Sequence, residues 1–226
     1  MTQYPANPAP PSIRIRKDGP YVVTGLPVRR MHAAESADGE LIAWITEPDL
    51  PAPEVTVLCR CGRSAQKPFC DGSHRGQFDG TETAPESAYD ERAEDYPGAG
   101  IVMRDDRGLC AHTGFCTTKG TTAWKLSHLT EDPAARAQLV AMVEHCPSGA
   151  LTYRGTGVER DAEPDLPAAV GVIDDGPLWI TGSVPVQLSD GRAAEVRPRM
   201  TLCRCGGSAN KPYCDGTHAT VGFADS

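Results

Sequence analysis

The sequence LCRCGRSAQKPFCDGSH at residues 58–74 decides the fold, and it returns as LCRCGGSANKPYCDGTH at residues 202–218. The two copies align without a gap. The repeat is longer than this motif, because DGPYVVTGLPV at 18–28 corresponds to DGPLWITGSVPV at 175–186. In both copies Asp-Gly-Pro is a turn signal, and the β-branched and aromatic residues after it predict a short strand. The chain therefore contains two copies of one small unit, each a few strands followed by a cysteine-rich loop.

The composition suits small, loop-rich units better than one large core. Of the 226 residues, 39% are hydrophobic and 6% are aromatic, and the chain has 23 Gly and 20 Pro. A unit of about 60 residues buries little apolar surface alone, so we expect the two copies to pack around an internal pseudo-two-fold axis. The predicted fold class is α+β and β-rich: an intramolecular pseudo-dimer of short strands, cysteine-rich loops and short helices, with an α+β insert, in a monomeric chain.

Changes in composition along the chain predict its domain organisation. Two polar stretches resemble linkers, and they bracket a separate middle unit. The predicted segments are a flexible tail at 1–12, the first repeat unit at 13–80, a linker at 81–95, the middle unit at 96–154, a linker at 155–168 and the second repeat unit at 169–226.

Charge and hydropathy exclude several classes of function. The chain has 22 Lys and Arg against 30 Asp and Glu, a formal net charge of −8, which disfavours non-specific binding to nucleic acid or an anionic membrane. No apolar run is long enough to span a bilayer, and residues 1–12 lack the features of a signal peptide. We therefore expect a cytoplasmic protein that binds neither membranes nor nucleic acid. No arrangement typical of a catalytic site is present, so we do not expect an enzyme.

The nine cysteines fall into three groups of three. An odd number leaves one thiol unpaired in a disulfide framework, and clustered cysteines in a reducing compartment usually bind metal. In each repeat, Cys-x-Cys is followed after eight residues by Cys-Asp-Gly-(Ser/Thr)-His. Three thiolates and one imidazole suit either an iron–sulfur cluster or zinc, but zinc knuckles usually place roughly two to four residues between the first two cysteines. The candidate ligands are Cys59, Cys61, Cys70 and His74 in the first repeat and Cys203, Cys205, Cys214 and His218 in the second.

Asp71 and Asp215 directly follow the third cysteine of their repeats. Asp is a strong helix N-cap, so a short helix is predicted to begin at each of these positions. Such a helix would place free N–H groups and the positive end of its dipole beside an anionic metal site.

Both repeats resemble the CDGSH iron–sulfur domain, the mitoNEET-like family. Its pattern, C-x-C-x₂-(S/T)-x₃-P-x-C-D-G-(S/A/T)-H, is met without departure in 59–74 and in 203–218. The resemblance implies that the three Cys and one His of each motif bind a redox-active [2Fe–2S] cluster. Many members of the family are homodimers with one motif per chain, so the resemblance also implies that a tandem chain forms the equivalent pair internally.

The middle unit carries the third group of cysteines, in GLCAHTGFC at 108–116 and CPSGAL at 146–151. A Cys-Pro after a helix is the closing ligand pattern of bacterial ferredoxins. That helix is predicted over 134–144, with Asp132 as its N-cap and Pro133 at its first position.

The middle unit resembles divergent single-cluster ferredoxins, including those that hold [3Fe–4S], and a divergent [4Fe–4S] domain found fused to CDGSH motifs. Its candidate ligands are Cys110, Cys116 and Cys146. Because there are three thiolate ligands, [3Fe–4S] is the simplest assignment of the cluster type. With His112 or a solvent oxygen as the fourth ligand, [4Fe–4S] becomes the alternative, and a hydrogen bond to a cluster sulfur or to the backbone is a further role for His112.

The predicted function is electron transfer by a protein with two [2Fe–2S] clusters and one [3Fe–4S] or [4Fe–4S] cluster, exchanging electrons with redox protein partners. One alternative is a cluster donor to apo iron–sulfur acceptors, or a redox or pH sensor, since imidazole titrates near neutrality. A structural zinc protein is the third hypothesis.

Overall fold

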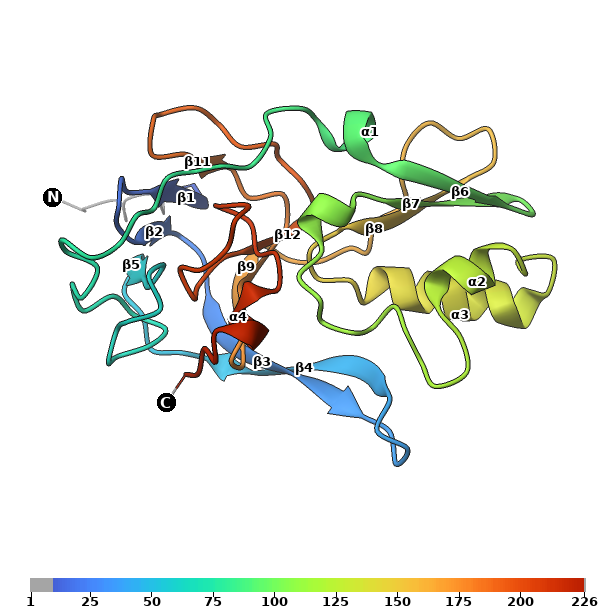
Figure 1. Cartoon of the computed structure of the whole chain (residues 1–226), viewed down its shortest axis with the longest axis horizontal. Helices are drawn as coiled ribbons and strands as arrows, with labels where there is room; N and C mark the ends of the chain where they lie inside the picture. Colours follow the sequence, from blue (N-terminus) through green and yellow to red (C-terminus); the bar gives the residue numbers. More distant parts are fainter. Residues whose placement is uncertain (1–9, 226) are drawn as a thin grey trace, which may run out of the picture.

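The structure is a computed structural model that describes residues 10–225. The first nine residues of the predicted tail at 1–12 lie outside the described residues, and Ser12 already begins the first strand. Figure 1 shows the strands of the two repeats on one side of the molecule and the middle unit, with its two longer helices, on the other. The chain is β-rich with few helices, as the predicted α+β class requires.

Nine strands from the two repeats form two mixed sheets. Their bounds are β1 Ser12–Ile15, β2 Tyr21–Thr24, β3 Val28–Glu35, β4 Leu41–Asp49, β5 Val55–Leu58, β9 Ala169–Ile173, β10 Leu178–Thr181, β11 Val186–Gln187 and β12 Arg199–Leu202. The sheet orders are β11-β1-β2-β5 and β12-β10-β9-β3-β4. The strands predicted after the two Asp-Gly-Pro turns are β2 and β10, and that prediction is confirmed.

The two repeats are joined by an exchange of strands. β11 of the second repeat pairs in parallel with β1, and β3 of the first repeat pairs in parallel with β9. Alternate residues of these short strands point to opposite faces of a sheet, and their inward faces meet in one core. The core side chains come from both repeats and include Ile13, Val23, Val28, Leu58, Val170, Leu178, Ile180 and Leu202. The predicted pairing of the two units within one chain is therefore confirmed.

The hairpin of β3 and β4 has no counterpart in the second repeat. In the first repeat it occupies the chain between Val28 and Val55, whereas Val186 and Arg199 of the second repeat are joined by a shorter segment. Figure 1 shows the two strands at the edge of their sheet, with the tip of the hairpin reaching out beneath the middle unit.

The middle unit is a three-stranded antiparallel sheet with helices on one face. Its elements are β6 Glu94–Gly98, β7 Ile101–Asp105, the 3-10 turn η1 Arg107–Leu109, α2 Ala123–Ser127, α3 Pro133–Glu144 and β8 Leu151–Gly155. Leu126 of α2 and Leu139 of α3 pack on Ile101 and Met103 of the sheet. The predicted helix is confirmed, because Pro133 is its first residue and the Asp132 side chain accepts a hydrogen bond from the Ala134 backbone N–H.

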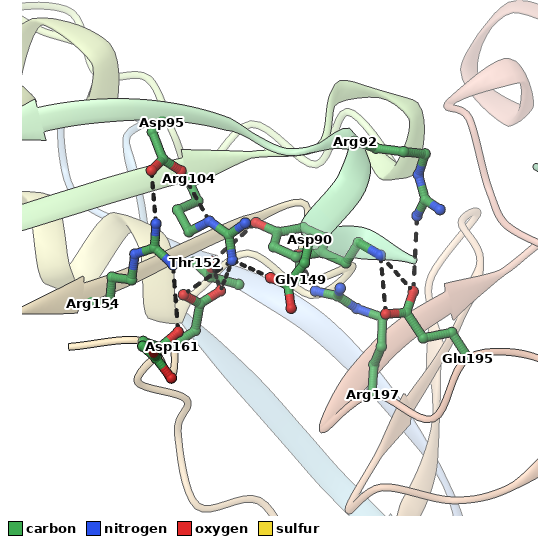
Figure 2. A network of polar contacts seen from close by, with 12 residues as sticks. Asp90, Arg92, Asp95, Arg104, Gly149, Thr152, Arg154, Asp161, Glu195 and Arg197 are labelled. Carbon is green, nitrogen blue, oxygen red and sulfur yellow. Dashed lines mark hydrogen bonds and ion pairs between the residues drawn. The ribbon is translucent and has the colours of Figure 1, made fainter. Parts of the chain in front are cut away.

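The two segments predicted as linkers both make buried contacts with the middle unit. The segment 81–95 contains the helix α1 (Tyr89–Arg92) and the beginning of β6. The Tyr89 side chain is buried, and its hydroxyl donates to the carbonyl oxygen of Ala150 at 3.1 Å. In the segment 155–168, Asp161 forms an ion pair with the buried Arg104 of β7 at 3.2 Å. Figure 2 shows that Arg104 and Asp161 belong to a larger polar network around α1.

Candidate functional site

The first cysteine loop is closed by its own backbone. It begins where β5 ends, and the backbone N–H groups of Cys59 and Cys70 donate to the carbonyl oxygens of Pro68 and Val57. These bonds bring the two ends of the loop together and place the four candidate ligands in two pairs. The Sγ atoms of Cys59 and Cys61 lie 3.8 Å apart, and the Cys70 Sγ lies 3.4 Å from Nδ1 of His74.

The second cysteine loop repeats this geometry. The Sγ atoms of Cys203 and Cys205 lie 3.7 Å apart, and the Cys214 Sγ lies 3.3 Å from Nδ1 of His218. A serine hydroxyl bridges each loop from inside, because the hydroxyl groups of Ser64 and Ser208 both donate across the loop to a carbonyl oxygen at 2.7 Å. Each loop therefore arranges its four predicted ligands in the same two close pairs.

The predicted helix at Asp71 is wrong. The chain after Asp71 forms turns, and in the second loop the four-residue helix α4 (Thr217–Thr220) begins after Gly216 instead of at Asp215. The left-handed backbone of the motif glycines, with φ of 91° at Gly72 and 84° at Gly216, prevents a helix from starting one residue earlier.

The two motif aspartates brace their loops instead. The Asp71 carboxylate accepts hydrogen bonds from the N–H groups of Ala65 at 2.8 Å and Ser73 at 3.0 Å. Asp215 accepts the same pair of bonds, from Ala209 at 2.8 Å and Thr217 at 3.0 Å. Each carboxylate thus joins the stretch before the third cysteine to the stretch after it.

The thiols of the two loops have shifted pKa values. The hydrogen bond between the paired thiols lowers the pKa of Cys59 and raises that of Cys61. In the second loop it lowers the pKa of Cys203 and raises that of Cys205. Burial raises the pKa of Cys214 to about 12. A bound metal centre offsets this cost of burying thiolate charge, because thiolates are the form that metals bind.

The Cys-x-Cys turns of the two loops touch each other. A β-carbon at Gly62 would lie 2.4 Å from the carbonyl oxygen of Cys205, and one at Gly206 would lie 2.8 Å from that of Cys61. Only glycine permits this approach of one backbone to the other. The two candidate metal sites therefore meet back to back through a reciprocal contact of their Cys-x-Cys turns.

Two buried arginines support the loops, and the sequence analysis did not single them out. Arg60 and Arg204 occupy the middle of Cys-x-Cys in their repeats, and each is 1% exposed. Arg60 Nη2 donates to the carbonyl oxygen of Gly80 at 2.7 Å, and Arg204 Nη2 donates to that of Ile173 at 2.7 Å. The repetition of Cys-Arg-Cys in both motifs was the available signal.

The third candidate site is a cavity of about 330 Å³ in the middle unit. Cys110 follows η1, Cys146 lies just beyond the C-terminal end of α3, and Cys116 lies on the loop between η1 and α2. All three line the cavity, and so does His112. The structure thus brings together the three predicted thiolates and the residue considered as a fourth ligand.

Each thiol of the middle site has a polar neighbour. Nη1 of Arg107 donates to the Cys110 Sγ at 3.4 Å, and the Ser148 hydroxyl lies 3.5 Å from the Cys146 Sγ. The Thr117 hydroxyl lies 4.0 Å from the Cys116 Sγ. Donors of this kind stabilise sulfur that carries negative charge.

The β3–β4 hairpin of the first repeat packs against residues beside the middle site. Leu41 lies against Gly114, where an added β-carbon would come within 3.3 Å of Leu41 Cδ1. The rings of Trp44 and Phe115 pack with their centroids 4.8 Å apart. Nε1 of Trp44 donates to the carbonyl oxygen of His145 at 2.9 Å. The hairpin therefore packs behind Gly114 and Phe115, two of the residues that line the cavity.

The donor sets fit iron–sulfur clusters. All nine cysteines lie within the described residues, and all of them are free thiols. Within residues 10–225, no three His, Cys, Asp or Glu side chains converge closely enough to hold a single metal ion. The ligands of each CDGSH-like loop lie instead in two pairs, an arrangement that suits one pair per iron of a two-iron cluster.

Comparisons with known proteins agree with these sites. The family model described as an iron-binding zinc finger of the CDGSH type matches residues 18–75 and 175–219. A second model, described as a divergent 4Fe–4S mono-cluster, matches residues 96–156. Neither the curated proteins nor the solved structures gave a match to the chain. None of the helices in the described part of the chain is both long and apolar enough to cross a membrane.

Proposed function

Because the chain is an iron–sulfur protein in which two CDGSH iron-binding domains flank a divergent 4Fe–4S mono-cluster domain, we propose that it transfers electrons between redox proteins. The observation that carries the proposal is the adjacency of the candidate sites. The two CDGSH loops touch at Gly62 and Gly206, and a hairpin of the first repeat packs on Phe115, which lines the middle site. Contact between redox sites favours exchange of electrons among them over a purely structural role.

The candidate ligands have defined roles in this proposal. Each CDGSH loop holds a [2Fe–2S] cluster through three thiolates and one imidazole, and such a cluster supplies one-electron redox chemistry when bound. Imidazole in place of thiolate raises the reduction potential of a site. The Cys205 and Cys214 sulfurs each accept a backbone N–H hydrogen bond at 3.4 Å, from Gly207 and Gly216, and such bonds stabilise the anionic cluster.

The middle site holds a [3Fe–4S] or a [4Fe–4S] cluster through Cys110, Cys116 and Cys146. Three thiolates line the cavity, which favours [3Fe–4S], whereas the matching family model is described as 4Fe–4S. Oxidised [3Fe–4S] gives an EPR signal that [4Fe–4S]²⁺ does not. An EPR spectrum of the anaerobically oxidised protein therefore distinguishes the two types.

Analysis of iron, acid-labile sulfide and zinc tests the proposal as a whole. Two [2Fe–2S] clusters and a third cluster predict about seven or eight iron atoms per chain, about eight acid-labile sulfides in either case, and no zinc. Rapid, reversible reduction with the iron retained supports the carrier role. A colourless zinc protein would reject the proposal and leave a structural role.

A second candidate function is donation of clusters to apo iron–sulfur proteins, or sensing of pH or redox state. The partial exposure of His74 and His218 favours it, since a ligand near the surface can be protonated and released. Faster movement of iron into an apo-acceptor than into a chelator would support the donor over the carrier. For either function the proposed partners are other proteins. We propose that the chain itself is a cytoplasmic monomer.

A further inference from the structure

The side chain of His112 brings the middle site against one of the two CDGSH loops. His112 lines the middle cavity, and its ring lies against Gly216 of the second loop. A β-carbon at Gly216 would be 2.6 Å from Cδ2 and 3.0 Å from Cγ of His112. The His112 ring therefore occupies the space between the middle cavity and the residues that separate Cys214 from His218.

The backbone holds His112 in this position. Its φ is 55°, in the left-handed region that a residue other than glycine adopts rarely and at some cost. A second contact fixes the two segments to each other, because Nδ2 of Asn210 in the second loop donates to the carbonyl oxygen of Gly108 at 2.6 Å. The segment before Cys110 is thus fastened directly to the second CDGSH loop.

The first CDGSH loop lacks this approach to the middle site. Gly72 occupies the position of Gly216, and a β-carbon there would have only the Arg75 side chain nearby, at 3.9 Å. Gln66, which corresponds to Asn210, has an exposed side chain. Figure 1 shows the second loop, with α4, between the loop of the first repeat and the middle unit.

We propose that His112 relays electrons between the middle site and the second CDGSH site, so that the three sites work in series: middle, second, first. The inference rests on the proposed electron-transfer function and gives it an order. One electron leaves the middle site, crosses at His112 and arrives at the second site; no bond breaks and no proton moves. The last step uses the backbone contact of Gly206 with Cys61. The electron source is a one-electron donor protein, or dithionite in the test.

EPR of the fully reduced protein tests the order. Removing the first site with Cys59→Ser/Cys70→Ser should leave the magnetic interaction between the middle cluster and its neighbour intact. Removing the second site with Cys203→Ser/Cys214→Ser should abolish that interaction. An interaction that persists without the second site, or vanishes without the first, would overturn the series.

Flash photoreduction tests the role of His112. His112→Ala should slow electron exchange between the middle and second sites several-fold, whereas His128→Ala, an exposed histidine of the same unit, should not. Equal rates in the two variants would overturn the relay.

If His112→Ala loses iron, Asn210→Ala compared with Gln66→Ala repeats the test with every candidate ligand intact, and equal rates overturn the relay there too. A chain without reducible clusters overturns the proposed function itself, whereas reducible but uncoupled clusters overturn only the series.

Discussion

The Tyr21 hydroxyl donates a 2.7 Å hydrogen bond to the carbonyl oxygen of Cys203. A strand of the first repeat thereby supports a candidate ligand of the second. The relation is not symmetric, because Leu178 occupies the equivalent position of the other repeat and has no hydroxyl. Tyr21 is fully buried, and this burial raises the pKa of its phenol, so the hydroxyl stays protonated and remains a donor.

Tyr21→Phe should therefore weaken the second cluster site more than the first. The variant leaves the Cys203 carbonyl oxygen without this donor in a buried place, which costs about 1–3 kcal/mol. Denaturant unfolding measures the loss of stability, and EPR of the reduced protein shows which [2Fe–2S] signal is lost first. Tyr96→Phe is the control, since the Tyr96 hydroxyl bonds the exposed carboxylate of Glu94. Equal effects of the two substitutions would contradict this account of Tyr21.

Asp71→Ala should make the first cluster labile. The variant removes the acceptor of the Ala65 and Ser73 N–H groups, so the two sides of the loop are no longer tied together. Loss of iron to a chelator, followed by absorbance, should become faster for one cluster of the pair. Asp79→Ala is a matched control, because Asp79 accepts from the N–H of Thr81 in the same local turn but does not bridge a cysteine loop. Unchanged iron release in Asp71→Ala would refute the bracing role.

Trp44→Ala should open the middle site without touching a ligand. Trp44 is partly buried, so the substitution should cost roughly 2 kcal/mol through lost packing on Phe115. Oxygen and chelators should then attack the middle cluster faster, while both [2Fe–2S] clusters keep their rates. Ile42→Ala, on the same strand and 53% exposed, controls for a change in the hairpin itself. A middle cluster equally resistant in both variants would show that the hairpin does not protect it.

Acid should release the second cluster through His218. Burial, followed in size by the charge of Arg204, lowers the pKa of His218 below its usual range. The unfolded chain then binds the proton more readily than the folded one, so this contribution to stability is complete above about pH 6.5 and is lost as the pH falls. Coordination adds to this trend, because only neutral imidazole binds metal. His218→Cys should shift loss of absorbance to lower pH; bleaching at the same pH as the parent would exclude His218 as the labile ligand.

Local signals in the sequence predicted the elements that local chemistry determines. Asp132 and Pro133 predicted where α3 begins, and the residues after each Asp-Gly-Pro predicted β2 and β10. The spacing of cysteine and histidine also predicted the four side chains that each loop brings together. In each case the deciding residues are close together in the chain.

Contacts between distant residues could not be predicted in this way. Strand exchange joins Ile13 to Val186, and a short apolar strand carries no signal that specifies its partner. The hydrogen bond from Trp44 to the carbonyl oxygen of His145 likewise joins two residues that are far apart in the chain. A helix does not begin at Asp71 because the next residue, Gly72, has a left-handed backbone. The capping propensity of Asp71 shows neither this conformation nor the bond of its carboxylate to Ala65 across the loop.

A coulometric reductive titration counts the redox sites of the protein. Each of the three sites should take up one reducing equivalent, and one equivalent should be lost in Cys59→Ser/Cys70→Ser, in Cys203→Ser/Cys214→Ser and in Cys110→Ser/Cys146→Ser. The remaining equivalents should still be taken up reversibly in each variant. A parent chain that takes up no electrons, or variants that all lose the same equivalent, would contradict the claim that this protein carries three redox sites.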